Sequence, residues 1–324
     1  MVLDTRLRSG FVAKPPAFGR GADCGGTGAY GLIKARVVAW AAQLDDAHRD
    51  GLATGLERAG AVVEVGSLHR GATYDVLTLE VQAGVLDASL RTGLAAWSAA
   101  SGIGAALVPE PVYASGRKLL IMDVDSTLIK QEVIELLAAH AGREAEVRAV
   151  TEAAMRGELD FSQSLHQRVR ALEGLPMSVI DEVVSRIELS DGAEQLVSAY
   201  RDAGHVVGVV SGGFSQVLAP VAERLRLSFA RANDLGLHDG MLTGRVSGAV
   251  VDRAEKERVL RAEAERAGVP LASTIAVGDG ANDLDMLAAA GLGVAFNAKP
   301  AVRASADVAL DLPDLDVVRH LSGL

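Results

Sequence analysis

The sequence has little cysteine and no long apolar run. Its 324 residues include one cysteine, Cys24, which excludes an intramolecular disulfide and a metal cluster built on several cysteines. No apolar stretch approaches the ~20 residues that a membrane-spanning helix needs. The first residues, Met1-Val-Leu-Asp-Thr-Arg, lack the apolar core of a signal peptide. We therefore expect a cytoplasmic protein without a membrane partner.

Positive charge is also scarce. The 32 lysines and arginines are outnumbered by 42 aspartates and glutamates, so the net charge is −10. This balance argues against a broad surface for nucleic acid or anionic membrane. The seven histidines do not form a metal-binding pattern. The hydrophobic content of 49% is enough for a substantial core, and the length allows two domains.

Residues 1–33 are expected to form an irregular arm, because glycine and proline recur there and no apolar periodicity is present. Residues 34–112 show four strand patterns and two helix patterns in the order βαββαβ, which is typical of a small ferredoxin-like domain. The strands are expected at Arg36–Ala41, Ala61–Ser67, Thr73–Val81 and Ile103–Val108, and the helices at Asp45–Arg58 and Gly84–Ala99.

Residues 117–324 alternate strands with helices, which predicts an α/β domain with a parallel sheet and helices on both faces. The apolar runs that predict its strands are Leu119–Met122, Val206–Val210, Ile275–Val277, Leu292–Phe296 and Val308–Leu310. The long interval between the first two runs has no good strand and predicts an inserted helical cap at about 130–190. Its helices are expected near Glu132–Ala141, Glu144–Arg156, Phe161–Leu172 and Met177–Ile187. Short glycine-punctuated β-like runs at 228–252 predict a β-flap near the active site.

Two acidic segments follow apolar runs of the predicted sheet. They are Asp123-Val-Asp-Ser-Thr127 and Gly278-Asp-Gly-Ala-Asn-Asp283. In open α/β sheets, ligands bind at the carboxyl ends of the strands, where several carboxylates are costly unless a cation lies there. A lone Asp-x-Asp usually marks a turn or a helix cap, but the two segments together predict an oxygen-ligand site for a hard cation such as Mg²⁺, and hence a magnesium-dependent phosphate enzyme.

The order of these segments, with Ser211-Gly-Gly and Lys256 between them, resembles the haloacid dehalogenase superfamily of aspartate-nucleophile phosphatases. The resemblance covers about 117–312. Within the cap, Glu132, Met155-Arg-Gly-Glu-Leu-Asp-Phe161 and Ser164-Leu-His-Gln-Arg168 are similar to the phosphoserine phosphatase branch of that superfamily.

The resemblance implies roles for four aspartates. Asp123 would be the nucleophile that forms an aspartyl-phosphate, and would also bind the metal. Asp125 would protonate the leaving oxygen, then deprotonate water, and would bind the metal through its main-chain carbonyl. Asp279 would be a direct magnesium ligand, and Asp283 would act in the metal shell or next to it.

Other residues would hold the substrate phosphate. The resemblance assigns Ser211, Gly212, Gly213, Lys256 and Asn282 to this task. It also makes Ser211 and Lys256 catalytic, with Lys256 screening the charge between the nucleophile and the phosphate. Taken alone, Ser-Gly-Gly is an ordinary loop that could bind phosphate at a helix N-terminus, and Lys256 could belong to a solvated helix face.

The cap would carry substrate specificity. Arg168 lies on or beside the apolar stripe of its predicted helix, where a snorkelling structural arginine is the alternative to a functional one. By resemblance, Arg168 would bind the substrate carboxylate and Glu132 the ammonium group. Met155 and Phe161 would line the apolar wall of the pocket, or belong to the core of the cap.

The resemblance thus implies hydrolysis of O-phospho-L-serine to L-serine and phosphate, the last step of L-serine biosynthesis, with one Mg²⁺ per active site. The alternatives are a related small-molecule phosphomonoesterase, a phosphotransferase, or a non-catalytic amino-acid sensor. Residues 34–112 resemble ACT-type domains and predict a possible homodimer. The turn at Gln43–Ala47 lacks the usual glycine, which favours a structural or dimerising role over ligand binding.

Overall fold

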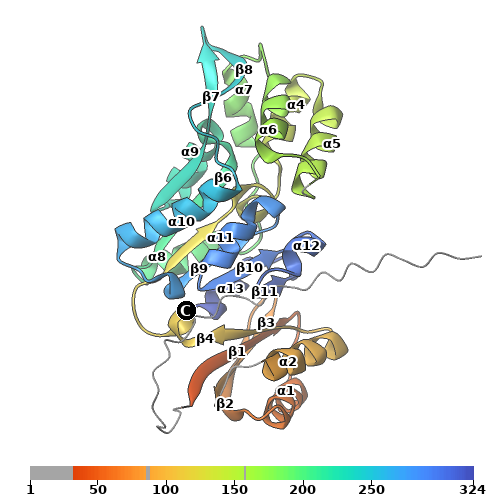
Figure 1. Cartoon of the computed structure of the whole chain (residues 1–324), viewed down its shortest axis with the longest axis vertical. Coiled ribbons are helices and arrows are strands. Elements are labelled where there is room, and N and C mark those ends of the chain that lie inside the picture. The colour runs from red at the N-terminus through yellow and green to blue at the C-terminus, as the bar shows by residue number, and fades with distance from the viewer. Residues whose placement is uncertain (1–31, 85–87, 157) are drawn as a thin grey trace, which may run out of the picture.

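A computed structural model describes residues 32–84, 88–156 and 158–324, which form two units stacked end to end (Figure 1). The smaller unit lies at the bottom of this view, the larger sheet lies above it, and the cap lies at the top. The predicted arm and Cys24 fall outside the described residues, apart from the last two residues of the arm. Among the described residues, no helix combines the length and apolar character needed to cross a membrane.

The first unit has the predicted βαββαβ order. Its strands form an antiparallel sheet in the order β2-β3-β1-β4. The elements are β1 (Ile33–Ala41), α1 (Asp46–Arg58), β2 (Val62–Arg70), β3 (Asp75–Ala83), α2 (Ala88–Ser101) and β4 (Gly104–Pro109). Strand β1 starts three residues before the prediction, because Ile33 already pairs with Ala83.

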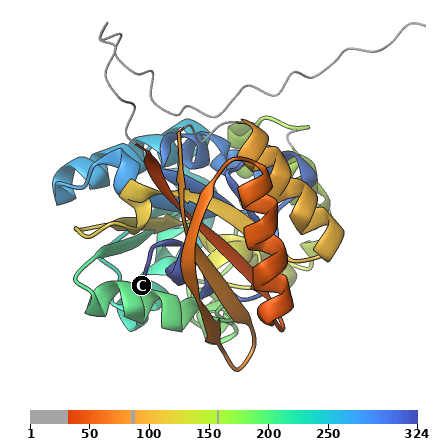
Figure 2. The same cartoon turned by 90° about the horizontal axis from the view of Figure 1, so that it is seen from below.

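The two faces of this small sheet bury different partners. Alternate residues of a strand point to opposite faces, so Val37 and Ala39 pack with Leu52 of α1, whereas Val38 and Trp40 join the core of the larger unit. The sheet is therefore covered by its own helices on one face and by the larger unit on much of the other. Figure 2 shows the small unit from below, in front of the larger one.

The second unit contains a seven-stranded sheet in the order β11-β10-β9-β5-β6-β7-β8. The α/β fold predicted from the sequence is therefore confirmed. All neighbours are parallel except β7 and β8. The strands are β5 (Leu119–Met122), β6 (Val206–Phe214), β7 (Phe229–His238), β8 (Met241–Ser247), β9 (Thr274–Gly278), β10 (Leu292–Phe296) and β11 (Val308–Leu310).

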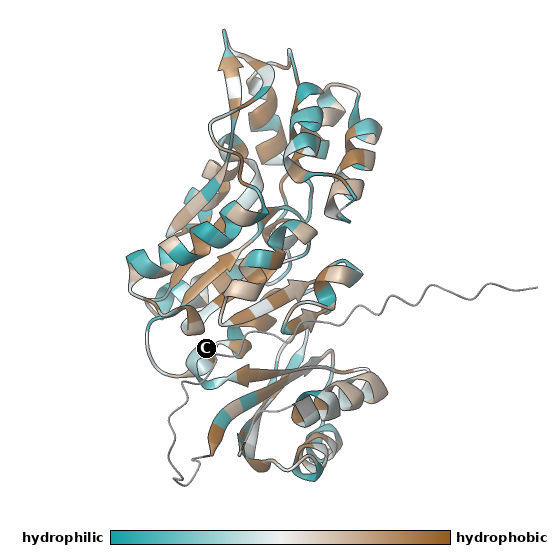
Figure 3. Ribbon diagram, in the orientation of Figure 1, coloured by the Kyte–Doolittle hydropathy of each residue, from teal (hydrophilic) through white to brown (hydrophobic). Residues whose placement is uncertain are grey.

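Helices cover both faces of this sheet, so its central strands are apolar along their whole length. Every residue of β5 is fully buried, and the central strands of the sheet are mostly brown, that is hydrophobic, in Figure 3. The helices on one face are α8 (Ala193–Asp202), α9 (Ser215–Leu225) and α13 (Val317–Leu321). Those on the other face are α10 (Arg253–Ala267), α11 (Leu284–Ala289) and α12 (Pro300–Arg303).

The cap lies between β5 and α8 in the chain and consists of four helices, as predicted. They are α4 (Val133–His140), α5 (Glu144–Met155), α6 (Phe161–Arg170) and α7 (Ser178–Ser185). The remaining elements of the described residues are short helical segments: α3 (Glu110–Tyr113), η1 (Val124–Leu128), η2 (Leu271–Ser273) and η3 (Ala281–Asp283).

The predicted flap is the β7–β8 hairpin, but β7 also belongs to the main sheet. Its first residues pair with β6 in parallel register. The hairpin is tied to the cap through the backbone: Leu242 N donates to Leu175 O (2.8 Å) and Met177 N donates to Gly240 O (2.9 Å). Cap and flap therefore share main-chain hydrogen bonds at the end of the molecule farthest from the small unit (Figure 1).

Candidate active site

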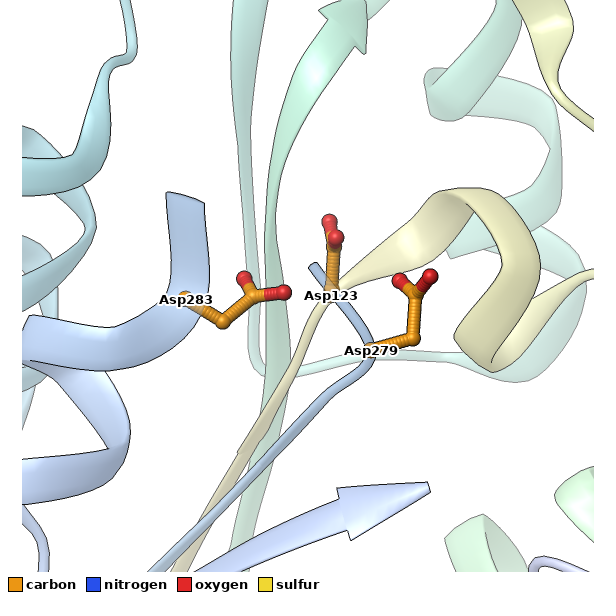
Figure 4. Close-up of side chains that lie close together, drawn as sticks. All are labelled: Asp123, Asp279 and Asp283. Carbon is orange, nitrogen blue, oxygen red and sulfur yellow. The ribbon is translucent and has the colours of Figure 1, made fainter. Parts of the chain in front are cut away.

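Three carboxylates meet at the carboxyl ends of β5 and β9. Asp123 follows β5 and Asp279 follows β9, and Asp123 N donates to Val277 O (2.9 Å). Asp283 ends the short helix η3. One oxygen from each of the three lies within 4.8 Å of the others, and all three side chains are buried. Figure 4 shows them side by side at this edge of the sheet.

Lys256 is the cation beside this cluster. Its Nζ lies 2.8 Å from Asp123 Oδ1 and 2.7 Å from Asp283 Oδ1, and its side chain is fully buried. Burial opposes its charge, but the charges of Asp123 and Asp283 prevail and raise the pKa of Lys256. The alternative of a solvated helix face is therefore wrong for Lys256.

The cluster still carries a surplus of negative charge. Burial, followed by the charge of Asp283, raises the pKa of Asp123 well above its usual range, although Lys256 opposes the shift. The same two causes raise the pKa of Asp279 to about 7. A buried surplus of carboxylate oxygens without sulfur or imidazole suits a hard divalent cation. The residues present therefore fit a divalent metal.

Asp125 lies outside this cluster, where its side chain is held by two donors. Val133 N donates to its Oδ1 (2.8 Å) and Ser211 Oγ donates to its Oδ2 (3.1 Å). Burial raises the pKa of Asp125 despite these hydrogen bonds. A carboxyl group with a raised pKa keeps its proton to a higher pH than an ordinary carboxyl group does, which suits a proton donor.

The Ser211-Gly212-Gly213 segment passes close to Asp125 and to the cap. It lies within the last four residues of strand β6, just before α9 begins at Ser215. A Cβ atom on Gly212 would lie 2.6 Å from the Phe161 ring, and one on Gly213 would lie 2.9 Å from Asp125 Oδ2. Only glycine allows the backbone to approach these groups so closely.

One pocket connects the aspartates to the cap. Its lining includes Asp123, Asp125, Glu132, Phe161, Arg168 and Asn282. The Oδ1 atom of Asn282 is buried and has no hydrogen-bond partner among the described residues. Asp279, Asp283, Lys256 and Ser211 lie next to this pocket rather than along its lining. Met155 ends α5, and its side chain is outside those that the structure describes.

Glu132 and Arg168 bring opposite charges to this pocket. Burial, followed by the charge of Asp125, raises the pKa of Glu132, and Ser126 Oγ donates to Glu132 Oε1 (2.7 Å). Burial lowers the pKa of Arg168, and the charges of Glu132 and Asp125 oppose this shift. Arg168 is 7% exposed, so the alternative of a snorkelling arginine with its head in solvent is wrong.

The sequence did not predict three polar residues of the site. Ser126 forms a hydrogen bond with Glu132, and Thr151 forms one with Arg168. Asn233 forms one with the carbonyl of Gly212. Ser126 lies within the first acidic segment and has a left-handed backbone (φ 56°), which is unusual for serine. An uncharged polar residue in a helix or strand gives no signal in one sequence, so Thr151 and Asn233 could not have been found.

The chain is similar to hydrolases and phosphatases. A sequence model of the haloacid dehalogenase-like hydrolases matches residues 120–288, just over half of the chain. A phosphoserine phosphatase of Streptomyces coelicolor is 54% identical over 271 residues, which cover 82% of this chain and 66% of that protein. The chain spans between about half and two thirds of the length of the first curated relatives it matches.

Solved structures show the same fold. A phospho-aspartyl intermediate analogue of phosphoserine phosphatase has a TM-score of 0.62 and 41% identity, and covers 64% of this chain and 99% of its own. A HAD family hydrolase from Salmonella enterica serovar Typhi has a TM-score of 0.78 and 27% identity, and covers 89% of this chain and 98% of its own. With the fold, the order of the acidic segments and these matches in agreement, the chain belongs to the haloacid dehalogenase-like hydrolase family.

Proposed function

We propose that the protein is a Mg²⁺-dependent phosphoserine phosphatase, which converts O-phospho-L-serine and water to L-serine and phosphate. The observation that carries the proposal is the pair Glu132 and Arg168, which line the same pocket as Asp123 and Asp125. The two cap residues form no ion pair with each other among the described residues, so both remain available. A carboxylate and a guanidinium facing one pocket suit the ammonium and carboxylate groups of an amino acid.

The first half of the reaction uses Asp123 and Asp125. A carboxylate oxygen of Asp123 attacks phosphorus, and the bond from phosphorus to the serine oxygen breaks. Asp125 donates a proton to that oxygen, so L-serine leaves as the neutral alcohol. Its raised pKa supports the protonated state that this step needs. The product on the enzyme is an aspartyl-phosphate at Asp123, the species named for the phosphoserine phosphatase analogue structure.

The second half returns the enzyme to its starting state. Asp125, now a carboxylate, takes a proton from water as the water oxygen attacks phosphorus. The bond between Asp123 and phosphorus breaks, and phosphate leaves. Asp125 is protonated again, so atoms and charges balance over the cycle.

We assign Asp123, Asp279 and the main-chain carbonyl of Asp125 to Mg²⁺, with Asp283 in its shell or next to it. The ion would offset the repulsion between the carboxylate of Asp123 and the anionic phosphoryl group. We assign the phosphoryl oxygens to the Ser211-Gly212-Gly213 segment, Lys256 and Asn282. The unpartnered Oδ1 of Asn282 supports a polar contact at this place.

A phosphate-release assay tests the proposal. O-phospho-L-serine is compared with phosphoethanolamine, which lacks the carboxylate, with 3-phosphoglycerate, which lacks the ammonium group, and with an aryl phosphate. We expect kcat/KM to be highest for phosphoserine and release to stop after exhaustive chelation and resume with Mg²⁺. Equal kcat/KM values across the series would refute the amino-acid specificity. Undiminished turnover after chelation would refute the metal. Transfer to an added alcohol acceptor that outpaces hydrolysis would favour the phosphotransferase alternative.

We also propose that this reaction forms the last step of L-serine biosynthesis and that the ACT-like unit mediates a homodimer. Since one face of its sheet packs on the larger unit, a dimer would have to use its helices or the edge strands β2 and β4. Light scattering of the purified chain measures its oligomeric state directly.

A further inference from the structure

The guanidinium of Arg168 is oriented by two neutral acceptors. Its Nε donates to Ser164 O (3.2 Å) on its own helix, and its Nη1 donates to Thr151 Oγ1 (3.1 Å) on helix α5. No carboxylate forms an ion pair with it among the described residues. Two acceptors on two helices are enough to fix the plane of a guanidinium group, which is rigid.

Thr151 is itself held in one orientation. Its hydroxyl donates to Val147 O (3.0 Å), one turn earlier in α5. A hydroxyl has one proton, so Oγ1 can only accept from Arg168. The side chain is 2% exposed and lines the pocket, and a β-branched side chain in a helix has few rotamers. Thr151 therefore presents a fixed acceptor to Arg168.

These contacts leave the other donors of Arg168 for a ligand. Guanidinium has five N–H groups, of which Ser164 and Thr151 take one each. The second proton of Nη1 and both protons of Nη2 remain, and Nη1 and Nη2 together form the end of the fork that binds a carboxylate with two parallel hydrogen bonds. Because such a pair depends on the plane of the fork, a small rotation would lose one of its bonds.

We propose that Thr151 is a specificity-determining positioning residue, which turns the fork of Arg168 toward the carboxylate of an amino-acid phosphate. The proposal rests on the proposed function above. Among the described residues, the Thr151 hydroxyl forms hydrogen bonds with Val147 O and Arg168 and with none of the aspartates. Its effect should depend on whether the substrate has a carboxylate, whereas a purely structural threonine would affect all substrates alike.

Thr151→Val tests the role of the hydroxyl, because valine keeps the shape and removes the acceptor. We expect KM for phosphoserine to rise about 3- to 10-fold, the effect of one weakened hydrogen bond, with little change in kcat. The ratio of kcat/KM for phosphoserine to that for phosphoethanolamine should fall by the same factor. Thr151→Ser keeps the hydroxyl and should restore the ratio to within about twofold of wild type.

A double-mutant cycle separates this role from packing. In an Arg168→Ala background, Thr151→Val should leave the substrate ratio unchanged, because the group it orients is gone. Ser305→Ala is the matched control, since Ser305 Oγ also donates to a carbonyl four residues earlier (2.9 Å to Ala301 O) but is exposed and does not line the pocket. If Thr151→Val does not fold, Thr151→Ala provides the same comparison without a methyl group against Arg168.

These measurements distinguish failure of the proposed function from failure of the role of Thr151. A wild-type enzyme without preference for phosphoserine would overturn the proposed function itself. A wild-type enzyme with this preference, and variants that lose activity equally on both substrates, would overturn only the role of Thr151. An unchanged ratio in a folded Thr151→Val variant would do the same.

Discussion

Lys256 forms ion pairs with two carboxylates of the site, those of Asp123 and Asp283. Among the described residues, the only ion pair of Asp123 is with Lys256. This arrangement holds the three side chains in place, yet it leaves the buried carboxylates with more negative than positive charge. Replacing a carboxylate there should therefore affect chemistry far more than stability.

The first prediction concerns Asp123→Asn. An amide is a poor nucleophile, so phosphate release should fall by at least about 10³-fold, in the range seen when a nucleophile is removed. The melting temperature should not fall by more than a few degrees, because the substitution also removes repulsion among buried carboxylates. Calorimetry and phosphate release measure both effects. Labelled phosphate trapped on another residue, such as Ser211, would contradict the assignment of the nucleophile.

The second prediction concerns Arg168→Ala. A charge-assisted hydrogen bond is worth about 1.5–3 kcal/mol, so kcat/KM for phosphoserine should fall roughly 10- to 150-fold. Turnover of an aryl phosphate, which lacks a carboxylate, should change much less. Steady-state kinetics on both substrates provide the comparison. The same fractional loss on both would indicate that Arg168 only supports the cap.

At the scale of elements, the strands that consist of a buried apolar run were predicted most accurately from the sequence. Strands β10 and β11 coincide with the predicted Leu292–Phe296 and Val308–Leu310, because strands covered on both faces must be apolar throughout. Strand β3 lies two residues beyond the predicted Thr73–Val81. An antiparallel strand is set by its pairing, here with β1, which a local pattern does not contain.

The acidic residues of the site could be predicted for a similar reason. Carboxylates at strand ends are costly and therefore conspicuous. Thr151 and Asn233 are neutral, and their roles come only from contacts across the fold. Asn233, on β7, is 1% exposed. It donates to Gly212 O (2.8 Å) and accepts from Val251 N (2.8 Å), just before the helix that carries Lys256.

The third prediction follows from this bridge between two elements. Asn233→Ala leaves a partly buried carbonyl and a buried amide without partners. The cost is about 1–3 kcal/mol for the amide and about 1 kcal/mol for the carbonyl. We expect the free energy of unfolding to fall by about 2–4 kcal/mol. Inhibition by inorganic phosphate should weaken, since both connected segments are assigned to the phosphate. Urea unfolding and inhibition constants measure these effects. An unfolding free energy within about 0.5 kcal/mol of wild type would show that the bridge is not needed.

At the scale of the whole molecule, the small unit lies at the end opposite the cap (Figure 1). The aspartates lie at the carboxyl ends of the parallel strands, so the small unit does not contact them. Its attachment combines an apolar face with polar contacts: Tyr74 Oη donates to Asp316 Oδ2 (2.7 Å), and Thr73 Oγ1 donates to Asp314 Oδ2 (2.9 Å). The interface should therefore govern stability and leave chemistry unchanged.

The fourth prediction concerns Tyr74→Phe. It removes a buried hydrogen bond to a carboxylate, so the free energy of unfolding should fall by about 1.5–3 kcal/mol, with kcat unchanged. Tyr113→Phe is the matched control, because the Tyr113 ring packs under Arg36 and its hydroxyl forms no hydrogen bond among the described residues. Urea unfolding of both variants measures the difference. Equal stability of the two variants would show that the contact with Asp316 contributes nothing.

The last prediction is a pH dependence of stability at this interface. His320 lies 5.1 Å from His69 and 5.9 Å from Tyr74, measured between ring centroids. Burial lowers the pKa of His320 from 6.5 to about 4, the charges of Arg319 and His69 add to the shift, and Asp316 opposes it. The folded protein thus keeps His320 neutral at a pH where the unfolded chain would protonate it.

The direction in which the free energy of unfolding changes with pH follows from proton linkage. Between pH 6.5 and about 4, the unfolded chain binds a proton at this residue that the folded protein does not bind, so unfolding becomes easier as pH falls. The stabilisation from neutral His320 is complete above pH 6.5 and is lost toward pH 4. His320→Gln does not titrate, so its free energy of unfolding should fall less than that of wild type across this window. Urea unfolding of both proteins at pH 7.5, 6 and 5 isolates the contribution of His320, because every other titrating group is shared. Parallel curves for the two proteins would mean that His320 gains a proton equally in both states, and that the interface tolerates its charge.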